Sequence, residues 1–255
     1  MWKLWSHSWK NLKNQIIGDF LKNKEIIGLV DFTLLKREKT KNELEKFLLK
    51  ANEYRPPAVC IFTEDILNAK KILDSGIQIA AVVGGFPEGS SNCDEIKKEI
   101  RTAIQLGADE IDIVLEPRED EKFPNEIELE KLVTMREASE GKILKVIIET
   151  PLLSERKIRA VTRMSLAVGV DFVKTCTGKR GECKESDADI LSYELMRHEL
   201  TFKEGLGMKI SGGISDKDKV IRFIEIIRKN DNRIIDEKRL RVGSSSLIGN
   251  LITIE

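Results

Sequence analysis

The chain alternates short apolar runs with longer stretches in which apolar residues recur every three or four positions. The apolar runs are about five residues long and rich in β-branched residues, which is typical of parallel strands buried on both faces. Eight such runs cover residues 28–33, 58–62, 79–83, 110–115, 144–149, 170–174, 207–211 and 240–243. The stretches between them predict helices with one apolar face, over 41–52, 64–75, 94–106, 126–139, 154–168, 186–198 and 216–229.

The spacing of these elements indicates the fold. Strand and helix repeat at intervals of roughly 30 residues, which is the length of a βα unit. The pattern predicts an α/β fold, a closed (β/α)8 barrel in which residues 1–255 form a single domain. A doubly wound open sheet is the alternative, but its first strand is normally followed by a glycine-rich turn. The segment DFTLL at 31–35 has no glycine, so the barrel is favoured.

Residues 1–24 precede the first predicted strand and predict an extra N-terminal helix. Trp2, Trp5 and Trp9, the three tryptophans of the chain, fall on one face of this helix. We expect this face to cover the bottom of the barrel. The alternative is a subunit interface in a homo-oligomer, because tryptophan is enriched in interface cores.

The composition excludes several classes of protein. Lys and Arg number 43, as do Asp and Glu, so the chain lacks the cationic excess with which proteins bind nucleic acid. A charged fraction of 34% is too high for a membrane protein. The four cysteines have no C-x-x-C spacing, and the segment after Met1 has no apolar core typical of a signal peptide. We therefore expect a cytoplasmic protein in a reducing compartment.

The scarcity of histidine limits the chemistry further. Only His7 and His198 are present, each among polar neighbours. We therefore do not expect a three-histidine zinc site or a Ser-His-Asp triad. Catalysis would rest on Lys, Asp, Glu, Cys, Ser or Thr, and we expect neither a metal nor another cofactor.

Ionisable residues inside the apolar runs are informative, because a buried charge is costly unless it is compensated. Most of them lie near the C-terminal end of a strand, where barrel enzymes place their chemistry. The main cases are Asp31, Asp112, Lys145, Glu149, Lys174 and Lys209. One interpretation is a structural ion-pair network, in which Glu149 pairs with a barrel lysine. The other is a catalytic site.

Two of these lysines suit nucleophilic catalysis. A lysine becomes a nucleophile near neutral pH when desolvation or an adjacent cation disfavours its charged form. Lys174 ends its strand and precedes a polar, glycine-containing turn, and Lys209 on the next strand would supply the adjacent positive charge. Asp112, on the fourth strand, would stand across the barrel mouth and transfer protons through water.

The loops after the seventh and eighth strands predict a phosphate site. They carry SGGIS at 211–215 and GSSS at 243–246, and each leads into a helix. In barrels these two loops commonly bind phosphate through backbone N–H groups and a helix N-terminus. Glycine permits close approach of the ligand, and serine adds hydroxyl donors.

Six segments resemble the deoxyribose-phosphate aldolase family and follow its order along the chain. They are DFTLL at 31–35, GADEID at 107–112, LKVIIET at 144–150, GVDFVKTCTG at 169–178, KISGG at 209–213 and RVGSSS at 241–246. The resemblance implies a metal-independent class I aldolase that reversibly cleaves 2-deoxy-D-ribose 5-phosphate into D-glyceraldehyde 3-phosphate and acetaldehyde. Its partners would be this sugar phosphate and acetaldehyde.

The resemblance also implies a role for each motif residue. Lys174 would form the Schiff base, Lys209 would favour its neutral amine, and Asp112 would transfer protons. Lys145 and Asp31 would lie behind these groups, with Lys145 in contact with Asp112. The residues implied to hold the substrate and its phosphate are Thr177, Gly178, Gly212, Gly213, Gly243, Ser244 and Ser245.

Several features depart from the family pattern. Residues 179–183, KRGEC, are unusually charged, and Ser215 stands where an arginine is usual. Some members carry a C-terminal tail ending in a tyrosine that helps proton transfer, whereas the two tyrosines here are Tyr54 and Tyr193. Two alternatives therefore stay open: a non-catalytic relative that binds a sugar phosphate, and an aldolase with a different substrate.

Cys60 and Cys176 are expected close to the site. We interpret Cys60 as a small buried residue at the mouth or in the core. The family resemblance implies that a cysteine at this position can react with aldehydes, so its reactivity is an open question, as is that of Cys176 beside Lys174.

Overall fold

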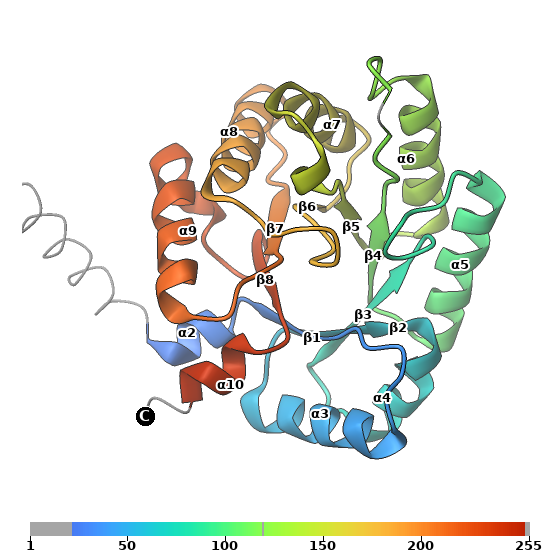
Figure 1. Cartoon of the computed structure of the whole chain (residues 1–255), viewed down its shortest axis with the longest axis vertical. Coiled ribbons are helices and arrows are strands. Elements are labelled where there is room, and N and C mark those ends of the chain that lie inside the picture. The colour runs from blue at the N-terminus through green and yellow to red at the C-terminus, as the bar shows by residue number, and fades with distance from the viewer. Residues whose placement is uncertain (1–21, 119, 253–255) are drawn as a thin grey trace, which may run out of the picture.

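The computed structural model describes residues 22–118 and 120–252. Eight parallel strands close into a barrel in sequence order (Figure 1). They are β1 (Val30–Leu34), β2 (Ala58–Phe62), β3 (Gln78–Val83), β4 (Glu110–Val114), β5 (Ile143–Ile147), β6 (Phe172–Lys174), β7 (Gly207–Ser211) and β8 (Leu240–Ser244). Pairing of β1 with β8 closes the barrel. The predicted (β/α)8 architecture is confirmed.

Helices surround the barrel on its outside (Figure 1). They are α2 (Asn23–Ile27), α3 (Lys41–Tyr54), α4 (Ile66–Ile72), α5 (Cys93–Leu106), α6 (Glu126–Ala138), α7 (Glu155–Ala167), α8 (Glu185–Phe202), α9 (Lys217–Asn230) and α10 (Leu247–Ile252). Short 3-10 turns occur at η1 (Thr63–Asp65), η2 (Thr150–Leu152) and η3 (Asn232–Ile234). The seven helices predicted between the strands correspond to α3–α9 to within a few residues, with one exception. The short helix α2 was not predicted.

The exception is the helix predicted over 64–75, which is split into η1 and the shorter α4. The Asn52 amide on α3 donates to the carbonyl of Ile72 at 2.8 Å and accepts from the backbone N–H of Asp74 at 2.8 Å. These bonds satisfy backbone groups at the end of α4, so the helix stops at Ile72. The residue responsible lies 20 positions away in sequence, so the local pattern could not reveal it.

Side-chain caps fix the starts of several helices. Thr40 and Glu43 form a capping box at α3, with the Thr40 hydroxyl accepting from the Glu43 N–H at 3.1 Å. Asp216 caps α9 by accepting from the N–H of Lys219 at 2.8 Å. This cap places the first turn of α9 directly after the glycine-containing loop that follows β7.

The first described residues pack beside the last ones. The side chain of Asn23 on α2 donates to the carbonyl of Leu251 on α10 at 2.9 Å, and the two helices lie side by side in Figure 1. The N-terminal helix expected over 1–24, with Trp2, Trp5 and Trp9, falls almost wholly outside the described residues. None of the described helices has the length and apolar character needed to cross a membrane.

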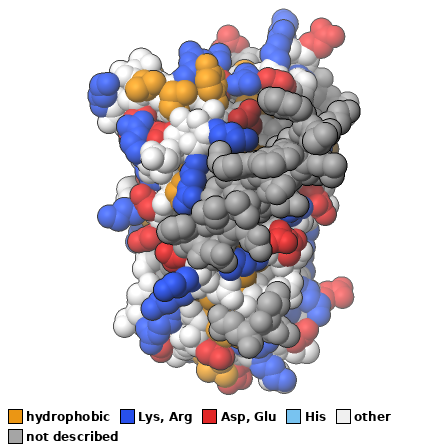
Figure 2. Space-filling view, turned by 90° about the vertical axis from the view of Figure 1, so that its left-hand side faces the viewer, with side chains coloured by type: hydrophobic (Ala, Val, Ile, Leu, Met, Phe, Trp, Pro, Cys, Tyr) orange, Lys and Arg blue, Asp and Glu red, His pale blue; other side chains and the backbone are white. Residues whose placement is uncertain are grey.

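On the face that carries α9, the visible side chains of the described residues include both positive and negative groups. Figure 2 views this face, and Lys and Arg side chains are interspersed there with Asp and Glu. This distribution agrees with the equal numbers of positive and negative residues in the chain.

The barrel interior has an apolar side and a charged side. The apolar side comes mainly from β2 and β3, where Cys60, Phe62, Ala80 and Val82 are buried in one small cluster. The larger core cluster lies between the strands and the surrounding helices and includes Phe223 of α9. The other strands direct ionisable side chains into the interior, and these form the site.

Candidate active site

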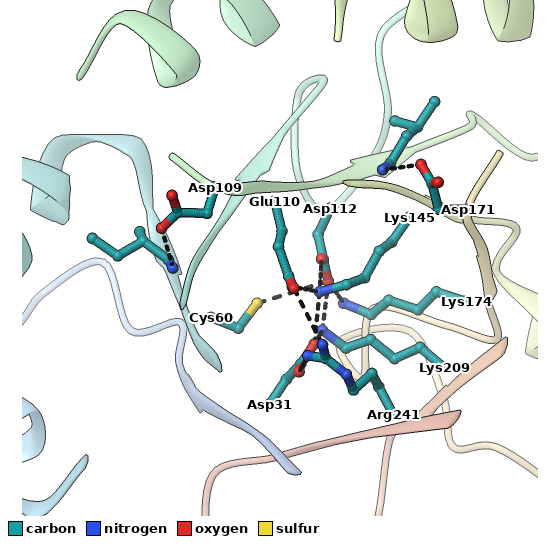
Figure 3. Close-up of polar contacts among 12 residues, drawn as sticks. Asp31, Cys60, Asp109, Glu110, Asp112, Lys145, Asp171, Lys174, Lys209 and Arg241 are labelled. Carbon is teal, nitrogen blue, oxygen red and sulfur yellow. Dashed lines mark hydrogen bonds and ion pairs between the residues drawn. The ribbon is translucent and has the colours of Figure 1, made fainter. Parts of the chain in front are cut away.

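Seven charged side chains that are almost fully buried meet inside the barrel (Figure 3). They come from six strands and are Asp31, Glu110, Asp112, Lys145, Lys174, Lys209 and Arg241. The register of the sheet pairs Lys174 with Lys209 and Lys209 with Arg241. Lys145 on β5 lies two residues before Ile147, which is the partner of Lys174. We call these seven residues the charge network.

Asp112 is the carboxylate at the centre of the charge network. Its Oδ2 accepts hydrogen bonds from Lys174 Nζ at 2.8 Å and from Lys209 Nζ at 2.7 Å. Its Oδ1 lies 3.2 Å from Lys145 Nζ. The contact between Asp112 and Lys174 is direct, where the sequence suggested a path through water.

Asp31 and Glu110 balance the remaining cations. Asp31 Oδ2 lies 2.8 Å from Lys145 Nζ and 2.5 Å from Lys209 Nζ. Arg241 donates to Asp31 Oδ1 at 2.7 Å and to Glu110 Oε1 at 3.3 Å. Glu110 also accepts a hydrogen bond from Lys145.

Sequence reasoning did not single out Glu110 or Arg241. The signal was nevertheless present, because both lie inside predicted apolar runs. Glu110 is two positions before Asp112 on β4, and residues two apart share a face of a strand. Once Asp112 is placed in the interior, Glu110 must point there too and needs its own cationic partner.

The pKa values of the buried groups reflect strong mutual compensation. Burial alone would raise the pKa of Asp112, but Lys145, Lys174 and Lys209 outweigh this effect and hold the pKa well below its usual range. The pKa of Asp31 is lowered in the same way, because nearby cations outweigh burial. Burial would lower the pKa of Lys209, but Asp112 and Asp31 raise it above the ordinary value. Both carboxylates are therefore ionised at neutral pH, and Lys209 is protonated.

The charge count distinguishes Lys174 from the other cations. The network holds four cations and three carboxylates. Deprotonation of Lys174 would leave three of each, a neutral and fully paired interior. Lys174 is also the one member of the charge network that lines the cavity above it. The arrangement can thus release one neutral amine toward a bound molecule without leaving an unpaired buried charge.

The cavity above Lys174 has a volume of about 460 Å³ and opens at the C-terminal ends of the strands. Pockets of this size hold small-molecule ligands. The structure brings all seven residues implied to hold the substrate to its wall: Thr177, Gly178, Gly212, Gly213, Gly243, Ser244 and Ser245. The amine and the glycine-serine loops therefore face one shared space.

Close backbone contacts shape this cavity. Gly178 and Gly212 have positive φ angles of 71° and 94°, and a Cβ on Gly178 would lie 3.3 Å from the Cα of Gly212. The Ser244 hydroxyl donates to the carbonyl of Ile214 at 2.6 Å and accepts from the N–H of Leu247 at 3.0 Å. These contacts join the loops after β6, β7 and β8 into one continuous wall.

The expected partner of Glu149 was wrong. Instead of pairing with a barrel lysine, its carboxylate lies 3.1 Å from Arg180 and accepts from the N–H of Thr177 at 3.2 Å. Glu149 follows β5 with φ at 56°, in the left-handed region. This backbone conformation turns the side chain out of the strand alternation and toward the loop after β6.

Cys60 and Cys176 both lie next to the site. Cys60 Sγ is 3.8 Å from Asp112 Oδ2, and Cys176 Sγ is 2.7 Å from the carbonyl oxygen of Ser211. Burial raises the pKa of the Cys60 thiol, and it raises the pKa of Cys176 to about 11. Both thiols are therefore protonated near neutral pH.

We expect the buried thiols to resist alkylation. At pH 8, iodoacetamide should label Cys60, Cys176 and Cys183 at least about 10-fold more slowly than the half-buried Cys93, because the thiolate is the reactive form. Peptide mass spectrometry over a time course measures the four rates. Labelling in urea, where all four sites are exposed, is the control. Labelling of Cys60 in the folded protein at the rate of Cys93 would contradict this expectation.

A closed parallel barrel with a polar cavity at the C-terminal ends of its strands is the arrangement of a (β/α)8 enzyme. The sequence profile of the DeoC/LacD family of aldolases matches residues 26–229. The chain therefore belongs to this family.

Individual relatives agree with this assignment. The chain is 36% identical over 199 residues to a deoxyribose-phosphate aldolase of Clostridium botulinum, with 77% of this chain and 90% of the relative covered. It is 33% identical over 202 residues to that of Finegoldia magna, with 79% and 92% covered.

Solved structures agree in fold. The aldolase QR15 superposes with a TM-score of 0.74 at 26% identity, covering 90% of this chain and 95% of the other. A tetrameric deoxyribose phosphate aldolase of Aeropyrum pernix has a TM-score of 0.74 at 21% identity, covering 94% and 96%.

Proposed function

We propose that this protein is a Schiff-base aldolase that reversibly cleaves 2-deoxy-D-ribose 5-phosphate into D-glyceraldehyde 3-phosphate and acetaldehyde. The observation that carries the proposal is the position of Lys174, whose amine borders the cavity and contacts Asp112 at 2.8 Å. Membership of an aldolase family and relatives named deoxyribose-phosphate aldolase support it.

In the proposed mechanism, the Lys174 amine attacks the aldehyde carbon of the open-chain sugar. Loss of water gives a protonated imine, which accepts the electron pair of the C2–C3 bond as that bond breaks. The proton of the C3 hydroxyl passes to a base, and D-glyceraldehyde 3-phosphate leaves. Protonation of the resulting enamine at C2 and hydrolysis of the imine release acetaldehyde and restore the amine.

Asp112 is suited to take and return protons in this sequence. Three cations hold its pKa low, and Lys174 is one of them. While Lys174 is neutral, one of these cations is lost, so Asp112 is a better proton acceptor until the protonated imine restores the positive charge. Lys209 and Lys145 then keep the carboxylate in place from the side away from the cavity.

The loops after β7 and β8 would hold the 5-phosphate at the far end of the cavity from the imine. Gly212 and Gly213 line this part of the cavity, and Ser245 adds an exposed hydroxyl at the wall. Because the protonated imine serves as the electron sink, the proposed chemistry requires no metal. Activity should therefore persist after treatment with EDTA.

Reductive trapping tests the proposal. Borohydride added in the presence of acetaldehyde should reduce the imine and leave one ethyl group on the protein, and peptide mapping should place it on Lys174. Formation of D-glyceraldehyde 3-phosphate from 2-deoxyribose 5-phosphate in a coupled assay should accompany it. A label on another lysine, or turnover without any label, would contradict the mechanism. Trapping without turnover of the sugar phosphate would favour an aldolase with a different substrate.

We also propose a homo-oligomeric, cytoplasmic enzyme. The tetrameric assembly named for the Aeropyrum pernix aldolase supports an oligomer, and the four free cysteines agree with a reducing compartment. The molar mass of the full chain in solution tests the first of these.

A further inference from the structure

The loop after β6 crosses the barrel mouth and is attached to three other elements. Lys179 Nζ donates to the carbonyl of Leu35 after β1 at 3.0 Å. Arg180 pairs with Glu149 after β5 at 3.1 Å. Glu182 pairs with Lys219 on α9 at 3.0 Å. The first two contacts hold the loop in place, whereas the third lies at the end of the cavity where the phosphate is proposed to bind.

Glu182 places a carboxylate against the glycine loop of the proposed phosphate site. It lines the same cavity as Lys174 and Gly213. A Cβ built on Gly213 would lie 2.1 Å from Glu182 Oε2, so the carboxylate group rests on the backbone of Gly213. An anionic side chain thus occupies space next to the backbone groups that an anionic ligand would use.

Lys219 is a cation that contacts both Glu182 and the backbone of Gly213. Its Nζ lies 3.0 Å from Glu182 Oε2 and donates to the carbonyl of Gly213 at 2.6 Å. Lys219 lies in the first turn of α9, whose N-terminus also favours negative charge. Lys219 is not itself part of the cavity wall, but both of its partners are, so a phosphate that replaced the Glu182 carboxylate would lie next to the same cation.

The Glu182 side chain can leave without disturbing the core. It is 68% exposed, while Lys219 is only 23% exposed and is held by the Gly213 carbonyl. Movement of Glu182 would expose the backbone of Gly213. It would also leave an N–H group of the Lys219 ammonium free to donate to a ligand. Lys219 would therefore stay in place, whereas a ligand could displace the Glu182 carboxylate.

We propose that Glu182 is a specificity-determining residue that acts as an internal competitor of the substrate phosphate. In the free enzyme its carboxylate occupies the phosphate end of the cavity, and a phosphorylated substrate must displace it from Lys219. Substrates without a phosphate do not use this end and bind with Glu182 in place. This inference rests on the proposed aldolase function, because it concerns the site at which that function would bind the substrate phosphate.

Two substitutions test the competition. Glu182→Gln should lower KM for 2-deoxyribose 5-phosphate roughly 3- to 10-fold, because it removes an exposed carboxylate from the path of a dianion. Lys219→Met should raise that KM by on the order of 10-fold. Neither substitution should change the KM for unphosphorylated 2-deoxyribose, and kcat should stay close to that of the wild type for both substrates.

Matched controls exclude a general charge effect. Glu185→Gln removes an exposed carboxylate three positions further along, whose partner is Arg222. Lys217→Met removes a cation from the same first turn of α9, where its amine contacts Asn23 instead of Glu182 and Gly213. Both control variants should keep the wild-type ratio of the two KM values.

Three results would overturn the inference: an unchanged KM for the phosphorylated substrate in Glu182→Gln, an increase in it, or an equal change for both substrates. Calorimetric binding of inorganic phosphate gives a readout that is independent of catalysis, and Glu182→Gln should tighten it by a similar factor. If reductive trapping at Lys174 fails, the aldolase mechanism is wrong, whereas the phosphate titration still decides whether Glu182 competes for the anion.

Discussion

Replacing Lys174 with methionine is expected to lower kcat/KM for 2-deoxyribose 5-phosphate by on the order of 10⁴-fold or more. Methionine fills a similar volume but cannot form an imine, so the reaction loses its electron sink. The charge network should remain intact, because three cations still face three carboxylates once Lys174 is absent. We therefore expect the free energy of unfolding to stay within about 1 kcal/mol of the wild type.

This combination of results is diagnostic. The coupled assay measures the loss of activity, and urea unfolding followed by circular dichroism measures stability. Lys50→Met, an exposed substitution on α3, is the control for the loss of one lysine. A variant at position 174 that kept a tenth of the wild-type activity would rule out a Schiff base there. A large loss of stability would instead indicate that Lys174 is needed as a cation in the resting protein.

The fold could be predicted because each strand leaves a signature in the local sequence. Strands of a barrel are covered on both faces, so every one appears as a continuous apolar run, and the helices between them keep one apolar face. The end of α4 could not be predicted, since it depends on hydrogen bonds from Asn52 on another helix. Long-range hydrogen bonds of this kind have no local pattern.

The candidate site was predictable where it lies on strands and less so where it lies on loops. Register carries Lys174 and Lys209 to adjacent positions, so a charge in an apolar run already indicates where its side chain points. The contacts of Glu149 and Glu182 depend instead on the backbone angles of loop residues and on the path of the loop after β6. No spacing rule gives those angles, so Arg180 and Lys219 could not be assigned as partners from the sequence.

Glu110→Gln should be strongly destabilising although it is a conservative substitution, with a cost of about 3–5 kcal/mol. Glu110 is 1% exposed and contacts both Lys145 and Arg241. Glutamine has nearly the same shape, so packing is kept and only the negative charge is lost. Two carboxylates would then face three cations even with Lys174 neutral, which leaves one buried positive charge without compensation.

The expected cost is large relative to the stability of a typical domain, which is about 5–15 kcal/mol. It corresponds to a fall of roughly 6–20 °C in Tm, measurable by calorimetry. Glu130→Gln on the exposed side of α6 is the matched control and should change Tm by no more than about 2 °C. A small effect at Glu110 would mean that the network tolerates an excess cation, and would remove the charge-balance argument for a neutral Lys174.

The pH dependence of the free energy of unfolding distinguishes the cost of an unpaired buried charge from that of a packing defect. The surrounding cations lower the pKa values of Asp31 and Asp112 in the folded protein. The stability that these carboxylates contribute is therefore fully present above their unfolded pKa of about 4. It is lost as the pH falls toward their lower pKa values in the folded state. Glu110→Gln leaves one cation of the charge network unpaired, so repulsion among the buried cations increases. Once Lys174 is neutral, the loss of one further lysine proton at high pH restores neutrality in the variant, whereas the same loss leaves the wild type with an unpaired carboxylate. High pH should therefore relieve the variant and not the wild type. A packing defect would give a loss of stability that is the same at every pH.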